Sequence, residues 1–240
     1  MQNNIPEIGK EYVSFIQKEI KDVRPDILLY GSTVYGKISS DLDISFIVKR
    51  YNKEEYEKIR DLTIEFQKRH NMDLDAEVPY SSKLIYTQQD VEYMLRNSPF
   101  RIENGMYRIT PIEKTNEFLG SKEMKYRLLL NILTTRSLLL IGDSRRISEY
   151  RQRAWDLLVK IIVSYNQLTE IDIDEFIRLL QRDKKTEQDG EMFLGYKTNI
   201  PQKQLDLEDD CEKALERLKK EGKLIQQSTR KFKINEDWER

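Results

Sequence analysis

The sequence predicts an α/β (α+β) fold: a small mixed sheet with flanking helices, then a helical lobe and a C-terminal module. Three patterns support this prediction. The apolar run Ile27–Tyr30, which stops at Gly31, is typical of a buried strand that ends in a turn. Residues 41–46 alternate polar and apolar side chains, as a strand with two unlike faces does. Residues 52–69 place apolar side chains on one helical stripe, so a helix follows these strands.

The predicted elements before residue 80 are helices alternating with strands. A first helix can begin at Pro6, because the residues after it form one apolar stripe: Ile8, Tyr12, Phe15, Ile16 and Ile20. A short helix over 33–36 follows the first strand, and Asn52 with Glu55 makes a capping start for the next helix. The third strand is expected over 72–79, where acidic and apolar residues alternate.

Helical periodicity dominates after residue 80. A helix over 90–96 and an extended pair that turns at Asn104-Gly105 precede a long helix over 121–141. The turn at 142–144 separates that helix from another over 147–168. We expect these two helices to pack as an antiparallel pair beside the sheet.

The last seventy residues predict a helix over 173–181, a strand-like segment over 192–196, a further helix and a hairpin of 224–227 with 231–234. Helix followed by hairpin resembles the end of a winged helix. Seven basic residues of this module could meet nucleic-acid phosphates: Lys213, Arg217, Lys219, Lys220, Arg230, Lys231 and Lys233. Acidic residues on the same helix weaken that interpretation, so a protein-contact or dimerising role is equally open.

Composition limits the partners and the compartment. The 240 residues include 41 basic and 42 acidic side chains, so no overall positive charge attracts nucleic acid. Cys211 is the only cysteine, which excludes an internal disulfide and fits a reducing cytoplasm. Neither a signal peptide nor a membrane anchor is indicated, so we expect a cytoplasmic protein without a membrane partner.

Two carboxylates on one face of a predicted strand follow the Gly31-Ser32 turn. Asp41 and Asp43 are two residues apart, so both project away from the apolar face that begins at Leu42. Neighbouring carboxylates repel each other, and a hard divalent cation lets both stay ionised. Gly31 lets the backbone approach a ligand, and the unpaired amides of a helix that begins at Ser32 suit a phosphate. These residues predict a site for a metal ion and a triphosphate.

This motif resembles that of the nucleotidyltransferase superfamily with the DNA polymerase β catalytic fold, which has a Gly-Ser, a short helix and Asp-x-Asp on a strand. The resemblance implies that Asp41 and Asp43 are catalytic metal ligands. It further implies that Gly31, Ser32 and Lys37 bind the nucleotide.

The same resemblance implies a third catalytic, metal-binding carboxylate on a later strand. Asp73, Asp75 and Glu77 compete for this role. Glu77, which lies between apolar neighbours, is favoured narrowly over Asp75, while Asp73 lies nearer the turn.

The chemistry that the resemblance implies is transfer of a nucleoside monophosphate from an NTP or dNTP to an acceptor hydroxyl, with pyrophosphate released and two Mg²⁺ or Mn²⁺ ions as cofactors. The favoured acceptor is a macromolecule: a nucleic-acid end, an oligonucleotide or a protein, as in toxin–antitoxin and defence relatives. Two alternatives stay open: modification of an aminoglycoside or lincosamide antibiotic, and a catalytically silent nucleotide-binding regulator. A homodimer that completes the cleft also stays open.

The expected organisation follows from these elements. A nucleotidyltransferase catalytic domain covers 1–118, a helical lobe covers 119–169, and a winged-helix-like module covers 170–240.

Overall fold

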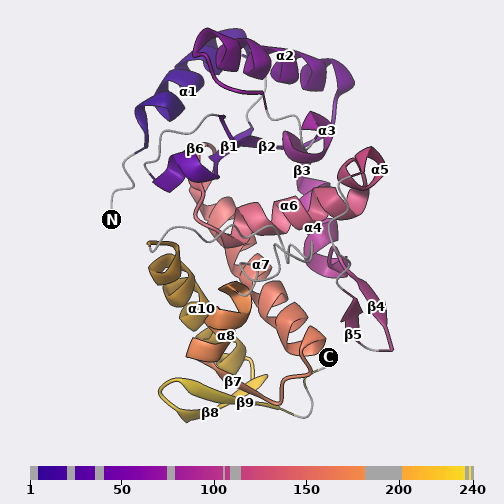
Figure 1. Cartoon of the computed structure of the whole chain (residues 1–240), viewed down its shortest axis with the longest axis vertical. Coiled ribbons are helices and arrows are strands. Elements are labelled where there is room, and N and C mark those ends of the chain that lie inside the picture. Colours follow the sequence, from indigo (N-terminus) through magenta and orange to yellow (C-terminus); the bar gives the residue numbers. More distant parts are fainter. Residues whose placement is uncertain are drawn as a thin grey trace.

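A computed structural model of the chain has a central mixed sheet with helices on both faces (Figure 1). It describes residues 5–20, 25–35, 41–74, 79–104, 106–108, 115–181, 202–235 and 238. Within these residues the central sheet joins four strands: β1 (Asp26–Leu29), β2 (Ile44–Val48), β3 (Ile85–Thr87) and β6 (Leu138–Ile141). Two small antiparallel sheets accompany it. The predicted mixed α/β class is confirmed.

Strand direction gives the central sheet two unlike edges. In the order β3-β2-β1-β6, β1 is antiparallel to both of its neighbours, and β3 is parallel to β2. Strands β2, β3 and β6 therefore run in the same direction and end together at one edge, which we call the carboxyl edge. Strand β1 ends at the opposite edge, where Gly31 follows it, and we call this the Gly31 edge.

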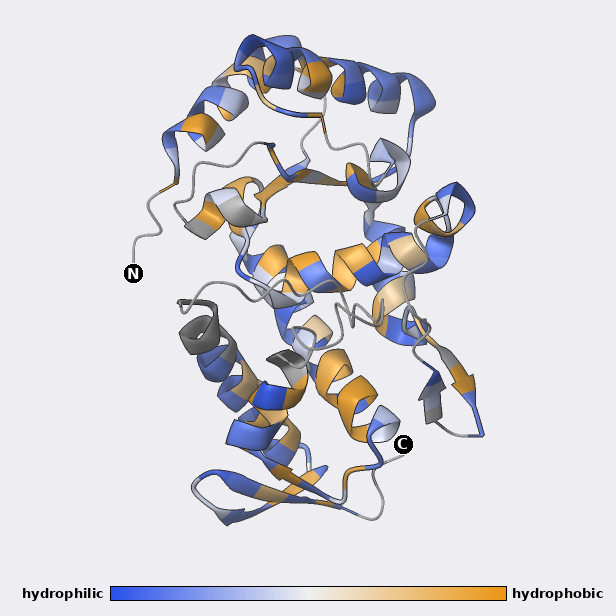
Figure 2. Ribbon diagram, in the orientation of Figure 1, coloured by the Kyte–Doolittle hydropathy of each residue, from blue (hydrophilic) through white to orange (hydrophobic). Residues whose placement is uncertain are grey.

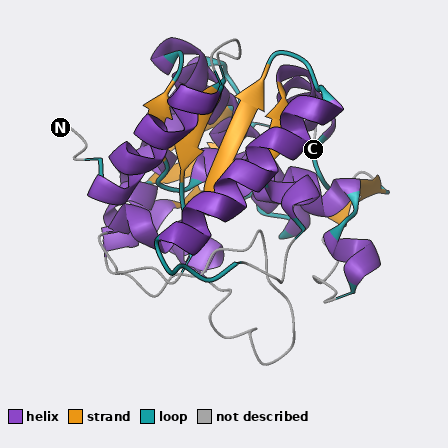
Figure 3. Cartoon of the chain, turned by 90° about the horizontal axis from the view of Figure 1, so that it is seen from above, coloured by secondary structure: helices purple, strands orange, loops and turns teal. Residues whose placement is uncertain are grey.

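Helices α1 (Glu7–Glu19) and α2 (Lys53–Arg69) cover one face of the sheet, and Figure 3 shows helices lying across the strands. Their inward side chains form the smaller of two apolar clusters, in which the Tyr12 ring meets the Phe66 ring edge-on at 5.1 Å. Both helices were predicted, and the Asn52 side chain caps α2 as expected. Figure 2 colours much of the sheet between these helices and the opposite layer as hydrophobic.

The opposite face is covered by α4 (Gln88–Asn97), α6 (Lys122–Thr134) and α7 (Ser144–Tyr165). Their apolar residues join Leu28 and Ile47 of the sheet in the larger cluster. The helix predicted over 90–96 is confirmed, because it lies within α4. Helix α6 packs on α7 as expected, although a strand separates them in the chain. The face with the larger cluster also supports the C-terminal part of the molecule (Figure 1).

The predicted helix over 121–141 is wrong in its second half, because α6 ends at Thr134 and β6 follows. The hydroxyls of Thr134 and Thr135 each donate at 2.7 Å to a carbonyl one turn earlier in α6. The Ser137 hydroxyl also turns back to the helix, at 2.8 Å. These bonds satisfy carbonyls at the helix end and let the chain leave it. A short apolar run such as Leu138–Ile141 does not by itself distinguish a helix from a buried strand.

Within the described residues, β3 is the strand that follows α2 and pairs with β2. The sequence predicted a strand over 72–79. The first three of those residues form no regular structure, and 75–78 lie outside the described part of the chain. The side-chain amide of Gln67 in α2 donates to the carbonyl of Asp73 at 3.3 Å, which holds Asp73 against the end of the helix. The three residues of β3 are Ile, Tyr and Thr, and none is acidic.

A small hairpin of β4 (Arg101–Glu103) and β5 (Met106–Arg108) follows α4, as predicted. Asn104 occupies its turn with a φ of +53°, which Asn adopts more readily than most residues. Helix α5 (Asn116–Leu119) then leads into α6.

The C-terminal part has its own antiparallel sheet in the order β7-β9-β8. Its elements are β7 (Glu170–Asp172), α8 (Ile173–Gln181), α10 (Gln202–Lys220), β8 (Leu224–Ser228) and β9 (Lys231–Ile234). The predicted helices and hairpin are confirmed, β7 was not predicted, and the strand-like segment over 192–196 lies outside the described residues. Cys211 is fully buried in α10, and burial raises the pKa of its thiol to about 12, so it packs as a small apolar residue.

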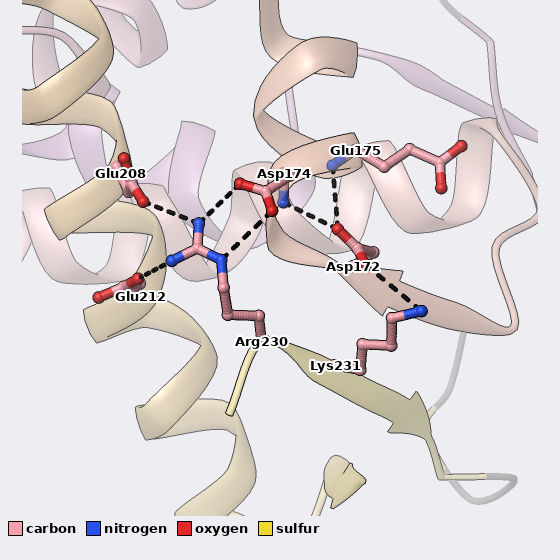
Figure 4. Close-up of polar contacts among 7 residues, drawn as sticks. All are labelled: Asp172, Asp174, Glu175, Glu208, Glu212, Arg230 and Lys231. Carbon is pink, nitrogen blue, oxygen red and sulfur yellow. Dashed lines mark hydrogen bonds and ion pairs between the residues drawn. The ribbon is translucent and has the colours of Figure 1, made fainter. Parts of the chain in front are cut away.

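Arg230 ties the hairpin turn to both neighbouring helices (Figure 4). Its guanidinium contacts Asp174 of α8 at 2.8 Å and two acids of α10, Glu208 at 2.7 Å and Glu212 at 3.1 Å. The hydrogen bonds to these carboxylates, first that to Asp174, raise the pKa of the guanidinium.

No helix of the described residues has the length and apolar character needed to cross a bilayer.

Candidate active site

The turn after β1 brings Gly31 against the carboxylate of Asp43. Gly31 has a left-handed backbone with a φ of +71°. A Cβ at this position would lie 1.9 Å from Oδ2 of Asp43, so only glycine leaves room for the carboxylate. The amide of Tyr30 donates to the Asp43 carbonyl at 3.0 Å, which extends the pairing of β1 and β2 beyond the strand itself. Gly31 and Asp43, at opposite ends of the motif, are therefore in contact.

Side chains alternate between the two faces of β2 as predicted. The apolar set lies in the smaller cluster, toward α1 and α2, whereas Ile47 lies in the larger one; the apolar set is Leu42, Ile44, Phe46 and Val48. Ser45 has the parity of Ile47 and so belongs to the face toward α6. Both acids are half-buried; Asp43 directly precedes β2 with the same parity, and Asp41 lies in a bend two residues earlier.

The short helix predicted over 33–36 corresponds to a helical turn over 32–35 in the structure. Ser32 begins η1 (Ser32–Tyr35), a single turn of 3-10 helix rather than an α-helix. One such turn has a small dipole, so any stabilisation of an anion here would depend on individual backbone amides. Lys37 lies outside the described residues.

The candidates for the third carboxylate are not brought to this turn within the described residues. Asp73 is exposed in the loop after α2, and Asp75 and Glu77 lie in the part of the chain that is not described. Among described residues, no group of three or more Asp, Glu, His or Cys side chains is arranged to hold a metal ion. The donors that the structure describes at the turn are thus Asp41 and Asp43.

Two further residues next to the acidic pair were missed by sequence reasoning. The Ser45 hydroxyl donates to the Lys83 carbonyl at 2.5 Å, which joins β2 to α3 (Tyr80–Lys83) just before β3. The Lys83 side chain is only 7% exposed, and its ammonium lies 5.0 Å from the centre of the Tyr80 ring. The spacing Asp-x-Asp-x-Ser could have indicated Ser45, because Asp43 and Ser45 share one strand face. No local pattern marks Lys83.

No protein-family model matches this chain, and no curated protein or solved structure does either. The nucleotidyltransferase resemblance therefore stays a prediction from the motif. The contact between Gly31 and Asp43 is the structural observation that now accompanies it.

Two basic residues of α6, Lys125 and Arg127, have acidic partners within the helical layer. The Lys125 ammonium lies 3.0 Å from the Asp90 carboxylate. Arg127 is 1% exposed and lies 3.3 Å from Glu123 in the same helix. These contacts assign both side chains to packing of the helical layer.

Proposed function

We propose that this chain is a metal-dependent nucleotidyltransferase with its active site at the Gly31 edge. The observation that carries the proposal is the carboxylate of Asp43 lying against the bare Cα of Gly31. This contact joins the Gly-Ser turn to the Asp-x-Asp pair, which is the arrangement that phosphate and metal binding at one point would need.

The donor set at this edge fits a hard divalent cation. Asp41 and Asp43 offer carboxylate oxygens two residues apart in the chain, and a divalent cation bound by both would lower the repulsion between them. Bound Mg²⁺ or Mn²⁺ would neutralise charge on the reacting phosphate oxygens. In the motif Glu77 or Asp75 would supply the third carboxylate.

The proposed reaction moves a nucleoside monophosphate to a hydroxyl. The acceptor oxygen attacks the α-phosphorus, the bond to the bridging oxygen of pyrophosphate breaks, and the acceptor proton passes to a nearby carboxylate. The amides of the Gly31-Ser32 turn would hold the outer phosphates during this step. An in-line displacement of this kind gains mostly from positioning and charge neutralisation.

The C-terminal part supports a protein rather than a nucleic acid as its partner. Its element order and its sheet order β7-β9-β8 support the winged-helix-like assignment. Five of the seven basic residues expected to meet phosphates contact carboxylates of the chain itself: Lys213, Arg217, Lys219, Arg230 and Lys231. Cations that are already paired release few counterions on binding DNA or RNA. We therefore favour a protein hydroxyl as the acceptor.

The test is transfer of label from each α-³²P-labelled NTP and dNTP, with Mg²⁺ or Mn²⁺, using the full chain. The chain is incubated alone and with protein extract, DNA, RNA or an antibiotic panel. The variant Asp41→Asn with Asp43→Asn should lose transfer while its thermal melting curve is unchanged. Glu54→Gln, which removes an exposed acid of α2, is the matched control and should keep full activity.

The molecule that carries the label after the reaction identifies the acceptor. Label on protein supports the favoured acceptor, whereas label on nucleic acid or on a drug supports the other enzymes. Absence of pyrophosphate release with every nucleotide and metal would contradict the proposal and favour a silent nucleotide-binding protein. Unchanged transfer in the double variant would remove Asp41 and Asp43 from the site.

A further inference from the structure

Helix α7 contains three half-buried arginines, and one of them differs from the other two in its partners. Arg146 and Arg153 each bind both oxygens of a carboxylate, at 2.7 to 2.9 Å. The guanidinium of Arg151 instead donates through Nη2 to the carbonyl and the hydroxyl of Ser137, both of which are neutral groups. Within the described part of the chain, Arg151 forms no ion pair.

The guanidinium of Arg151 is charged but poorly solvated. Its Nε–H is buried and has no hydrogen-bond acceptor among the described residues. Burial lowers the pKa of the group, and the charge of Asp210 on α10, which is exposed, offsets this effect only in part. A half-buried cation that is held by neutral groups of its own chain is a candidate for binding an anion from outside.

Strand pairing places Ser137 at the Gly31 edge of the sheet. Leu29, the last residue of β1, pairs with Leu138, the first residue of β6. Because these two strands are antiparallel, Tyr30 and Ser137 are the next residues at this edge. The guanidinium that binds Ser137 therefore lies beside the strand that leads into the Gly31 turn.

The same edge carries Asp43 on the other side of Tyr30. The Tyr30 amide donates to the Asp43 carbonyl at 3.0 Å. The Tyr30 side chain packs against the larger cluster, on the sheet face toward α7, and Asp43 and Ser137 have the parity of that face. Neighbouring strands are about 4.8 Å apart, so roughly 10 Å separates Asp43 from Ser137. A polyphosphate that reaches from Asp43 past Tyr30 would meet the guanidinium of Arg151.

The guanidinium of Arg151 is held in a fixed orientation. The Ser137 hydroxyl accepts a hydrogen bond from it at 2.8 Å and itself donates to the Ile132 carbonyl of α6 at 2.8 Å. Nη2 makes both bonds to Ser137, and Nη1 makes none to any residue that the structure describes. Arginine presents a planar fork of donors that matches the oxygens of a phosphate. A phosphate can therefore bind Arg151 without breaking the bonds that orient it.

The charges around this guanidinium are compatible with a phosphate. Arg136 lies two residues before β6 and is half-buried, so a second basic residue adjoins Arg151 at this edge. Asp210 is exposed on α10 and forms no ion pair with Arg151. Asp41 and Asp43 lie beyond Tyr30, where the divalent cations of the proposed reaction would bind them.

We propose that Arg151 binds the terminal phosphate of the nucleoside triphosphate, and then the leaving pyrophosphate, on the side of the Gly31 turn away from Asp43. This role rests on the proposed nucleotidyl transfer. When the bond to the α-phosphorus breaks, its electron pair stays with the pyrophosphate oxygen. Arg151 keeps its proton throughout and stabilises this charge by hydrogen bonding.

The first test measures binding without turnover, by isothermal titration calorimetry of the full chain with Mg²⁺ and inorganic tripolyphosphate. The parent chain should bind one tripolyphosphate. Arg151→Met keeps the apolar stem without the donors and should weaken binding roughly tenfold to a hundredfold, as loss of a charged hydrogen bond would. Arg151→Lys keeps the charge without the fork and should lie between. The control Arg145→Met removes an exposed arginine of the same helix and should bind like the parent.

The second test is the transfer assay. Arg151→Met should raise the KM for the nucleotide and lower kcat, while the KM for the acceptor stays unchanged. A general loss of folded protein would lower the rate without changing either KM.

The two proposals fail in different ways. Parent-like tripolyphosphate binding by both Arg151 variants, or equal weakening by Arg145→Met, would overturn the role of Arg151 and leave the nucleotidyltransferase proposal standing. Tripolyphosphate binding that depends on Arg151, in a chain that transfers no nucleotide to any acceptor, would overturn the transfer proposal and keep Arg151 as a polyphosphate-binding residue.

Discussion

The two ends of β1 are built around the same local contact. At the Gly31 edge the carboxylate of Asp43 lies where a Cβ of Gly31 would be, with Oδ2 at 1.9 Å. At the carboxyl edge Asp26 lies against Gly142 in the same way, with Oδ1 at 2.2 Å. Both glycines have a positive φ, +71° for Gly31 and +132° for Gly142, and each precedes a helical segment.

The partners of the two carboxylates differ. Asp26 is fully buried, Arg146 binds both of its oxygens, and the amide of Asp143 donates to it at 2.8 Å. Asp43 is half-buried and has a second acid, Asp41, two residues earlier in the chain. A buried carboxylate that is bound by a guanidinium of the chain stabilises the fold, whereas two neighbouring carboxylates can share a bound divalent cation. The glycine contact alone therefore does not distinguish a structural acid from a catalytic one.

The largest expected contrast comes from removing one charge at each end. Asp43→Asn should lower nucleotide transfer roughly a thousandfold, because a metal ligand is lost, and should leave stability almost unchanged. Asp26→Asn should keep activity per folded molecule but lose about 2–4 kcal/mol of unfolding free energy, because Arg146 loses its buried partner. Urea denaturation and transfer assays on both variants measure the two effects.

The assignment of Asp43 to catalysis and of Asp26 to stability would be wrong if the two variants showed the opposite effects. A large stability loss in Asp43→Asn with retained transfer would make Asp43 a structural residue. Double replacement of Asp26 and Arg146 by Asn and Met serves as the control, since it removes both charges and should recover part of the lost stability.

The next largest expected effect is the difference in stability loss between Gly31→Ala and Gly142→Ala. The three atoms nearest to a Cβ at Gly31 belong to the Asp43 side chain, which can rotate away. Gly31→Ala should therefore cost about 1–2 kcal/mol for its backbone but displace the carboxylate and reduce transfer. Gly142→Ala also meets the Cα of Asp26, at 2.8 Å, and has a φ that side chains rarely adopt. It should cost about 3 kcal/mol or more. Thermal melting of both variants would show this order, and equal losses would contradict it.

The local half of the candidate site could be predicted from the sequence. The Gly31 turn and the alternation after Asp41 depend on neighbours within a dozen residues, so strand periodicity was sufficient to place Leu42, Ile44, Phe46 and Val48 in one apolar cluster. The order of helices and strands up to α2 was predictable for the same reason. No residue distant in the chain had to be known.

The other half depends on contacts between distant residues. Asp26 and Arg146 are 120 residues apart, and neither belongs to a recognisable motif. Strand β6 consists of four apolar residues that fit a helix equally well until their pairing with β1 is known. The burial of Lys83 depends on the short helix α3 packing beside β2, which the alternating acids of 72–79 did not predict.

The smallest expected effect concerns the charge of Asp143, which caps α7 beside Asp26. Hydrogen bonds from the amides of Arg146 and Arg145 lower the pKa of this carboxyl. A lowered folded pKa means that the charged form adds stability above the ordinary value of about 4, and that this stability is lost as the pH falls through the folded pKa. Asp143→Asn keeps a capping oxygen without the charge. Its urea midpoint should lie slightly below that of the parent chain near pH 7 and meet it in strong acid. A difference that persists at pH 2.5 would show that shape rather than charge at the cap stabilises this end of β1.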